Sequence, residues 1–372
     1  MKYCSKCLQP DTRPNIKFDE DDVCPPCQYM DKFKEIDWNE RDKELQEVIK
    51  FGKENNVSGY DCIIGVSGGK DSLRQSLYVR DQLKLNPLLV HCSYPPEQLT
   101  EVGAENISNL IDLGFDTVSV SPGPISWKEL MKQGFYESAQ WSKSTEMALF
   151  ASLPKMAIAY HIPLIFLGEN PATQDGELGS GSLNWDGTNM RNINTIKDGP
   201  DNLLKMTDKV NEENAFWYRY PDDEEMINGR IKIVYLGYFI KNFTKPDNGN
   251  FSIMHGLDIR DDVPENTGDL FPFECIDEDF VIMNQMIKYM KLGFGKVTEE
   301  VSEAIRLGII DRNQGIELVN KFDGKCDEKY ILNFCDYVGI STEEFWNVAE
   351  SFRNRDIWIQ NDSQEWELKV KP

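Results

Sequence analysis

The residues best suited to chemistry in this chain form the run Ser67-Gly68-Gly69-Lys70-Asp71-Ser72. An apolar segment with β-branched residues, 60–66, comes directly before the run and predicts a buried strand. Apolar residues then recur at helical spacing, so we expect a helix to begin near Ser72. Glycines between a strand and a helix let the backbone approach a ligand closely, and free N–H groups at a helix N-terminus favour anions. The run therefore predicts a cradle for phosphate groups.

Within this cradle we expect Ser67, Gly68, Gly69 and Ser72 to donate hydrogen bonds to the phosphates of a bound nucleotide, from backbone N–H groups or hydroxyls. Lys70 would add a positive charge. The run is not a Walker A motif, because that motif ends in Gly-Lys-Ser/Thr after four spacer residues. The alternative is a Ser/Gly-rich turn between a strand and a helix that binds nothing.

Two carboxylates near the predicted cradle suggest a magnesium site. Asp71 would repel phosphate unless a cation lay between them, and a carboxylate together with phosphate oxygens suits Mg²⁺. Glu169 lies in Gly168-Glu169-Asn170-Pro171, directly after the strand-like segment 164–167. Loops after parallel strands meet at the ligand-binding edge of a sheet, so the first three of these residues are candidates for a phosphate or Mg²⁺ site. The alternatives are a first-turn carboxylate stabilised by the helix dipole at Asp71 and a plain helix-entry turn after the strand.

The adenine of a bound nucleotide should lie near the end of strand 88–91, held by backbone groups. We include His91 among the candidate nucleotide-binding residues because it stands at this strand end, the alternative being simple packing. The chain has three histidines, and its sequence shows no Ser-His-Asp or Cys-His nucleophile. We therefore assign the catalytic roles to Asp71 and Lys70, through positioning and electrostatics.

Four cysteines near the start of the chain have the spacing of a structural zinc site. Cys4 and Cys7 form one CxxC pair, and Cys24 and Cys27 form a second pair after sixteen intervening residues. Four thiolates complete a tetrahedral Zn²⁺ shell and leave no open position for a substrate. A module this small needs its metal to fold. The alternative is a redox pair or a set of unrelated thiols.

Composition narrows the classes of function. The chain has 372 residues, of which 40% are hydrophobic and 28% charged, as in an ordinary globular protein. Its formal net charge of −23 argues against a nucleic-acid partner, since such binding depends on phosphate neutralisation by Lys and Arg. The sequence contains no apolar segment long enough to span a bilayer and begins without a signal-peptide core. We expect a cytoplasmic protein with no membrane insertion.

Strand-like segments alternate with helical ones between residues 61 and 167, which predicts an α/β fold with a parallel sheet. We expect a zinc-binding module over 1–32, a nucleotide-binding domain over 33–275 and a C-terminal helical region over 276–372. The stretch 174–201 is rich in Gly, Asn, Asp and Ser and predicts a long loop, within a substrate loop near 171–230. Whether this loop covers a substrate stays open.

The run 67–72 resembles the PP-loop of the ATP pyrophosphatases, which cleave ATP to AMP and pyrophosphate while activating an oxygen. More widely, the chain resembles the N-acetyl sugar amidotransferases of surface-polysaccharide and nonulosonic-acid biosynthesis, of the pseudaminic-acid type. Four segments carry this resemblance besides the PP-loop and the second cysteine pair: 3–14, 167–171, 288–296 and 311–319. One segment departs from the family pattern, because His91-Cys92-Ser93-Tyr94-Pro95-Pro96 replaces an Asp/Asn-rich turn.

This resemblance implies a PP-loop domain of the adenine nucleotide alpha hydrolase-like fold, a zinc-ribbon-like N-terminal module and a C-terminal helical region. It implies an ATP-dependent amidotransferase that converts the N-acetyl group of a sugar, linked to a nucleotide, into an acetamidino group through an O-adenylated intermediate. The implied cofactors are ATP, Mg²⁺ and Zn²⁺. The sequence shows no glutaminase signature, so the resemblance also implies a separate glutaminase with a cyclase-like partner that together supply ammonia. The implied pathway is the biosynthesis of lipopolysaccharide O-antigen or another surface polysaccharide.

Two other functions fit part of the pattern. Some tRNA 2-thiolation enzymes also join CxxC zinc modules to a PP-loop, but they need sulfur, and neither the acidity of this chain nor its cysteine spacing favours them. A non-catalytic ATP-binding scaffold held together by a zinc module would bind nucleotide without forming AMP.

Overall fold

The computed structural model describes residues 1–174, 184–193 and 195–372. A five-stranded parallel sheet with the order β3-β2-β1-β4-β5 forms its centre, which confirms the predicted parallel α/β fold. The strands are β1 (Cys62–Val66), β2 (Pro87–Cys92), β3 (Thr117–Val120), β4 (Leu164–Leu167) and β5 (Lys232–Tyr235). Ile63 of β1 pairs with Leu88 of β2 on one side and with Ile165 of β4 on the other. The strand that leads into the PP-loop is thus the central strand.

Successive side chains of these strands enter two separate apolar cores, because neighbouring residues of a strand point to opposite faces of the sheet. Ile64 and Leu89 lie in the core on one face, and Ile63 and Leu88 lie in the core on the other. Each such fully buried aliphatic side chain contributes roughly 1.5–3 kcal/mol relative to an exposed one. Burial on both faces explains why the strands read as continuous apolar runs.

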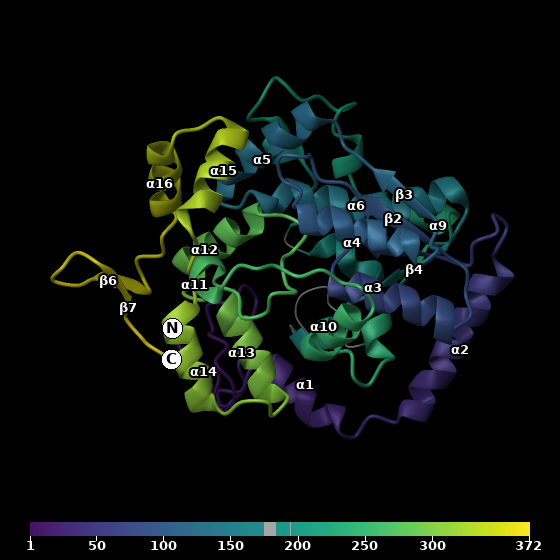
Figure 1. The fold of residues 1–372 in the computed structure, drawn as a ribbon, viewed down its shortest axis with the longest axis horizontal. Helices are drawn as coiled ribbons and strands as arrows, with labels where there is room; N and C mark the ends of the chain where they lie inside the picture. The colour runs from purple at the N-terminus through teal and green to yellow at the C-terminus, as the bar shows by residue number, and fades with distance from the viewer. Residues whose placement is uncertain (175–183, 194) are drawn as a thin grey trace.

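Helices cover both faces of the sheet (Figure 1). Helices α2 (Trp38–Glu54), α3 (Lys70–Leu77) and α4 (Glu101–Asp112) contribute to the core on one face, and α6 (Ser142–Tyr160) and α9 (Asp223–Asn228) contribute to the other. Helix α3 begins at Lys70, two residues before the position expected from the sequence, and continues as a π-helical turn over Tyr78–Gln82. Helix α10 (Lys245–Met254) packs along α3, next to the PP-loop.

The C-terminal region is helical, as predicted, and shares a core with the rest of the chain. Its helices are α12 (Phe280–Leu292), α13 (Lys296–Arg306), α14 (Arg312–Phe322), α15 (Glu328–Val338) and α16 (Thr342–Ser351). Phe345 of α16 stacks on Phe135 of α5 (Pro124–Ser138), with ring centroids 5.2 Å apart. Beyond α16 the expected tail contains a small antiparallel hairpin, β6 (Trp358–Gln360) and β7 (Trp366–Leu368).

The N-terminal module lies against the C-terminal helices, beside α13 and α14 in Figure 1. The backbone N–H of Leu8 donates to the Ser302 hydroxyl at 3.3 Å, and Arg13 forms an ion pair with Glu299 at 3.0 Å. The two ends of the chain also meet, since the Tyr3 hydroxyl donates to the Val370 carbonyl at 3.4 Å. The module contains one helix, α1 (Pro25–Phe33), which packs on the short helix α7 (Pro171–Gln174) after β4.

The remaining helical segments are short and connect these elements: α8 (Asp201–Leu204), α11 (Pro264–Thr267) and the 3-10 turns Thr188–Asn192, Phe216–Tyr218 and Leu236–Tyr238. The last of these turns directly follows β5. The Gly-rich part of the predicted loop, 175–183, lies outside the described residues, as does residue 194. Among the helices that the structure describes, none combines the length and apolar character needed to cross a membrane.

Candidate functional site

The PP-loop is a tight turn between the central strand and α3. Gly68 has a φ of +88°, a conformation that residues with a Cβ rarely adopt. A Cβ at this position would also lie 3.2 Å from the Asn106 side chain and 3.3 Å from the Gly103 carbonyl. The Ser72 hydroxyl donates to the Gly69 carbonyl at 2.8 Å, which closes the turn. The first backbone N–H groups of α3 have no acceptor within the helix and remain available to an anion.

The turn lies where the strand order of the sheet reverses. From β1 the chain proceeds outward to β2 and β3, then returns to place β4 and β5 on the other side of β1. In open α/β sheets, ligands bind at such a switch point, beyond the carboxyl ends of the strands. A cavity of about 220 Å³ lies there, and the residues lining it include Ser67, Asp71, Ser72, Gly168 and Glu169. The structure thus brings the loop after β1 and the loop after β4 to one cavity.

Asp71 lines this cavity and is held in place by its neighbours. One carboxylate oxygen accepts a hydrogen bond from the Asn248 side-chain amide at 2.5 Å, and the other accepts from the Lys70 ammonium group at 2.9 Å. Arg74 in turn donates to the amide oxygen of Asn248, which fixes that amide. The Ser252 hydroxyl donates to the Lys70 carbonyl at 2.7 Å and ties α10 to α3. Sequence reasoning missed Asn248 and Ser252, because α10 carries Pro, Asn and Gly residues that obscure a helical pattern.

Lys70 lies behind the PP-loop and is absent from the residues that line the cavity. Its ammonium group is buried between the carboxylates of Asp71 and Glu274, and Glu274 also accepts from Lys296 at 2.6 Å. Burial alone would lower the pKa of Lys70, but the two carboxylates outweigh it and raise that pKa. The structure therefore places the positive charge of Lys70 in an ion-pair network that orients Asp71, rather than at the cavity surface.

Glu169 faces the cavity from the loop after β4. The Glu169 side chain is exposed at the cavity. Loss of water on the side that faces the protein raises the pKa of its carboxyl group to about 7, and the negative charge of Asp71 adds to this rise. The next residue, Asn170, is buried and donates to the Gly237 carbonyl at 3.3 Å. A Cβ at Gly237 would lie 2.8 Å from the carbonyl oxygen of Glu169, so only glycine permits this close approach.

His91 lies in β2, but its neighbours Val90 and Cys92 line the cavity instead. Because side chains alternate along a strand, His91 points to the opposite face of the sheet. Burial lowers its pKa to about 4, and its Nε2 atom has no hydrogen-bond partner among the described residues. This placement leaves the backbone at the end of β2 as the candidate contact for a nucleobase.

The four predicted zinc ligands are buried and meet at one point. The sulfur atoms of Cys4, Cys7, Cys24 and Cys27 all lie within 4.8 Å of one another. The Cys4–Cys27 and Cys7–Cys24 sulfur distances are 3.9 and 3.6 Å, close to the roughly 3.8 Å expected between thiolates around a tetrahedral Zn²⁺ with Zn–S bonds of about 2.3 Å. Backbone N–H groups point at two of these sulfurs, which suits thiolates. The residues present fit a structural zinc ion.

Arg306 connects this cysteine cluster to the loop after β4. One guanidinium nitrogen lies 3.9 Å from the Cys7 sulfur, and the other donates to the Thr173 carbonyl at 3.3 Å. Thr173 belongs to α7 and donates both its N–H and its hydroxyl to the Asn170 carbonyl. Three contacts, Cys7–Arg306, Arg306–Thr173 and Thr173–Asn170, therefore connect the cysteine cluster to the loop that carries Glu169.

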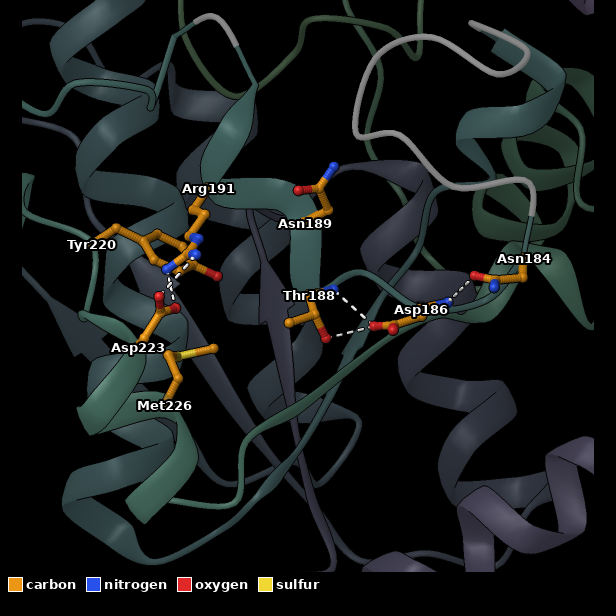
Figure 2. A pocket seen from close by; sticks show the side chains of 8 residues that line it. All are labelled: Asn184, Asp186, Thr188, Asn189, Arg191, Tyr220, Asp223 and Met226. Atoms are coloured by element: carbon orange, nitrogen blue, oxygen red, sulfur yellow. Dashed lines mark hydrogen bonds and ion pairs between the residues drawn. The ribbon is translucent and has the colours of Figure 1, made fainter.

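A second and larger cavity, of about 420 Å³, lies beyond β5 (Figure 2). Its wall is polar and comes from two parts of the chain, 184–191 and 220–226. Arg191 and Asp223 form an ion pair across it, and Asp186 accepts hydrogen bonds from the N–H and hydroxyl of Thr188. Among the described residues, it shares no lining residue with the cavity at the PP-loop.

The fold and these contacts define an α/β protein with the glycine turn 67–72 at the switch point of its sheet and a cysteine cluster suited to zinc. Residues 266–371 match the family described as "LPS biosynthesis protein WbpG-like, C-terminal domain". The match confirms the resemblance drawn from the sequence and supports a role in surface-polysaccharide biosynthesis. It covers the C-terminal helices and Glu274, the partner of Lys70.

A second comparison concerns a shorter segment. Over 88 residues, or 23% of the chain, it is 31% identical to a protein named "Uncharacterized protein MJ1599" from Methanocaldococcus jannaschii. The aligned segment spans 31% of the length of that relative. The name of that protein assigns no activity to it.

Proposed function

We propose that this chain is an ATP-dependent amidotransferase that converts the N-acetyl group of an acetamido sugar into an acetamidino group during surface-polysaccharide biosynthesis. The observation that carries the proposal is the meeting of the PP-loop and the Glu169 loop at one cavity, in a chain whose C-terminal part matches a lipopolysaccharide-biosynthesis family. The reaction would take place in the cytoplasm, where ATP is available.

The chemistry proceeds in two balanced steps. An amide resists ammonia because its oxygen is a poor leaving group. The amide oxygen attacks the α-phosphorus of ATP, the bond to pyrophosphate breaks, and the amide nitrogen loses a proton, which gives an O-adenylated imidate. Ammonia then adds to the imidate carbon and AMP departs with the oxygen, which leaves an amidine. The amidine takes up a proton near neutral pH and becomes a cation.

The residues at the cavity suit the first step. Backbone N–H groups of the PP-loop, including that of Ser72, and the hydroxyl of Ser67 would hold the departing pyrophosphate. Asp71 and Glu169 are the carboxylates that would hold Mg²⁺, which when bound offsets the charge that develops on the phosphates. Asp71 is oriented for this purpose by Lys70 and Asn248. Positioning and electrostatics suffice, so the proposal needs no protein nucleophile.

The second step needs a nitrogen source. We propose that a separate glutaminase with a cyclase-like partner supplies ammonia, as the sequence resemblance implies. Free ammonium at high concentration should replace these partners in a test, because the activation machinery lies in this chain.

A tRNA thiolation enzyme is less well supported. Cys92 lines the nucleotide cavity, but burial raises the pKa of its thiol to about 12, so it stays protonated at neutral pH and is a poor nucleophile. The net charge of −23 also opposes the approach of tRNA.

The decisive experiment supplies ATP, Mg²⁺, concentrated ammonium salt and a panel of N-acetylated and di-N-acetylated sugars, free and linked to nucleotides. A true substrate should yield AMP, pyrophosphate and a product that binds to a cation exchanger because of its amidinium charge. AMP formation that requires tRNA and a sulfur donor, and that no sugar provokes, would overturn the proposal. Nucleotide binding without AMP formation under any of these conditions would favour the scaffold.

A further inference from the structure

Hydrogen bonds and a helix cap hold the two walls of the cavity beyond β5, which Figure 2 shows. The backbone N–H of Tyr235 donates to the Trp185 carbonyl at 2.8 Å, and that of Gly187 donates to the Ile233 carbonyl at 2.9 Å. The segment before Thr188 therefore runs along the edge of β5 as an added extended segment. On the opposite wall, Asp222 caps α9 in a reciprocal capping box with Glu225, which fixes the neighbouring Asp223. Preformed walls are typical of a small-molecule site.

The lining of this cavity suits a ligand with several hydroxyl groups. Its side chains include amides, carboxylates, a hydroxyl, a guanidinium and a phenol, so donors and acceptors are both present, and Met226 adds an apolar surface. The lining residues are Asn184, Asp186, Thr188, Asn189, Arg191, Tyr220, Asp223 and Met226. Vicinal hydroxyls of a sugar ring need such paired donors and acceptors, while the C–H face of the ring packs on apolar groups. At about 420 Å³ the cavity has the size of a small-molecule site.

The Tyr220 side chain lines the cavity, and its hydroxyl is one of several buried tyrosine hydroxyls for which the described residues show no hydrogen bond. Buried hydroxyls are nearly always paired, and leaving one unpaired costs free energy that a ligand hydroxyl or carbonyl would restore. Figure 2 shows Tyr220 beside Arg191, whose guanidinium is already paired with Asp223.

The charge of the lining selects against an anion. Arg191 is its single cation, and Asp186 and Asp223 are two carboxylates, so the described lining carries a net negative charge. A diphosphate would meet this field and the acidity of the whole chain, whereas a neutral ring would not.

The position of the cavity fits a substrate that also reaches the nucleotide. Met226 belongs to the same apolar core as Val90, Leu153 and Leu167, which line the cavity at the PP-loop. Both cavities are thus on the α6 side of the sheet. Because they share no lining residue among those described, a substrate that occupies both must be longer than a single sugar ring.

From these observations we infer that the cavity beyond β5 binds a neutral polyhydroxylated ring of the substrate, at a distance from the reacting acetamido group. The inference rests on the proposed function for the identity of the substrate. The ring is either a sugar of the substrate or the ribose of its nucleotide carrier, and the two share the same hydrogen-bonding chemistry.

Calorimetric titration tests this with three probes: N-acetylglucosamine, its uridine diphosphate conjugate, and uridine diphosphate alone. Tyr220→Phe and Asp223→Asn should weaken binding of the conjugate by about tenfold each, the loss of roughly one hydrogen bond. Neither should change the affinity for a non-hydrolysable ATP analogue. Glu224→Gln, next to Asp223 but outside the cavity lining, is the matched control and should leave all affinities unchanged.

The outcomes separate this inference from the proposed function. Sensitivity of free N-acetylglucosamine and the conjugate to the variants assigns the ring to a sugar, and sensitivity of uridine diphosphate and the conjugate, but not of the free sugar, assigns it to the ribose. Binding of uridine diphosphate that is lost in Arg191→Gln but unchanged in Tyr220→Phe and Asp223→Asn would make the cavity an anion site and overturn the inference. Wild-type protein that binds none of the probes, or variants that bind them normally, would overturn it too. If the variants lose the probes but no sugar provokes AMP formation, the ring site stands and the proposed reaction fails.

Discussion

Lys70 of the PP-loop forms a buried ion pair with Glu274, a residue about 200 positions further along the chain. Glu274 lies in the part of the chain that matches the lipopolysaccharide-biosynthesis family, so this part contacts the loop 67–72 directly. Glu274 also pairs with Lys296, and Lys70 also pairs with Asp71. The C-terminal region thus helps to orient the carboxylate proposed to hold Mg²⁺.

We expect Glu274→Gln to destabilise the protein strongly. The substitution leaves the buried charges of Lys70 and Lys296 without their shared carboxylate, and breaking a buried pair in this way costs roughly 3–5 kcal/mol. Chemical denaturation measures the loss. Glu265→Gln is the matched control, because its pair with Lys321 is exposed and should contribute only about 0–1 kcal/mol. Equal effects of the two substitutions would contradict the role of Glu274.

The same pair sets a pH dependence of stability. Burial alone would raise the pKa of Glu274. The charges of Lys296 and Lys70 outweigh burial and hold this pKa well below its usual range in the folded protein. The ionised Glu274 carboxylate therefore stabilises the folded protein at pH values above the ordinary carboxyl pKa, and this stabilisation is lost as the pH falls below that value. Acid denaturation of Glu274→Gln should accordingly show less of this loss than the wild type.

We expect Asp71→Asn to keep the fold and to reduce ATP-to-AMP turnover by about 10²-fold or more, since it removes one preorganised charge from the phosphate site. An amide has the same shape as the carboxylate and can keep one of its two contacts, to Lys70 or Asn248. AMP release with saturating substrate measures the effect, and thermal unfolding checks the fold. Normal AMP release would assign Asp71 to the stabilisation of α3 by the helix dipole.

Glu169 should make the Mg²⁺ requirement depend on pH. Its pKa is raised to about 7, so the carboxylate that would hold the ion loses its charge below that pH and gains it above. The wild type should need less Mg²⁺ for half-maximal AMP formation at pH 8 than at pH 6. In Glu169→Gln the Mg²⁺ requirement should be the same at pH 8 and pH 6, except for the part of the difference that comes from protonation of ATP itself. Glu137→Gln, whose side chain pairs with Lys143 away from the cavity, is the control. A pH dependence that persists in Glu169→Gln would exclude this role.

The sheet and the cysteine cluster could be predicted because their signals are local. The strands are apolar runs buried on both faces, and the CxxC pairs have fixed spacing, so neighbouring residues suffice to recognise them. Helices α5 and α10 have weak local signals in the sequence. Helix α5 is buried around much of its circumference and shows little amphipathic pattern, and α10 is held by the Thr244 cap and by contacts with α3 rather than by helix propensity.

The site could be predicted only in its parts. Ser67, Asp71, Ser72, Gly168 and Glu169 line the cavity, since each follows a strand that ends at the same edge of the sheet. The placement of Lys70 and His91 depends on partners distant in sequence and on the face of β2, which a pattern of residues does not reveal. The sequence likewise gives no sign that Arg306 lies beside Cys7.

Zinc content should depend on all four cysteines. We expect purified protein to contain one Zn²⁺ per chain and Cys24→Ser to lose it, because the remaining three thiolates leave the shell incomplete. Loss of the metal should destabilise the N-terminal module, which has only a small apolar core of its own. Elemental analysis and thermal unfolding provide the two measurements, with Cys326→Ser as the control, a cysteine outside the cluster. Full zinc content and unchanged stability in Cys24→Ser would leave the cluster without a metal role.

Arg306 should transmit the state of the cysteine cluster to the nucleotide cavity. Its guanidinium joins the Cys7 sulfur to the carbonyl of Thr173, and Thr173 is bonded to the loop that carries Glu169. Removal of zinc from the wild type should therefore weaken binding of a non-hydrolysable ATP analogue. Arg306→Leu should retain zinc but bind the analogue more weakly.

The effects of zinc removal and of Arg306→Leu on nucleotide affinity should also be coupled. Zinc removal should have a smaller effect in Arg306→Leu than in the wild type, with a coupling energy of about 0.5–3 kcal/mol, the range for groups in contact. Zinc content and analogue affinity, measured with and without a chelator, complete the cycle. Arg355→Leu is the control, since that guanidinium is exposed and pairs with Glu350 away from the cluster. Strictly additive effects of zinc removal and Arg306→Leu would show that the cluster supports the fold without acting through Arg306 on the nucleotide cavity.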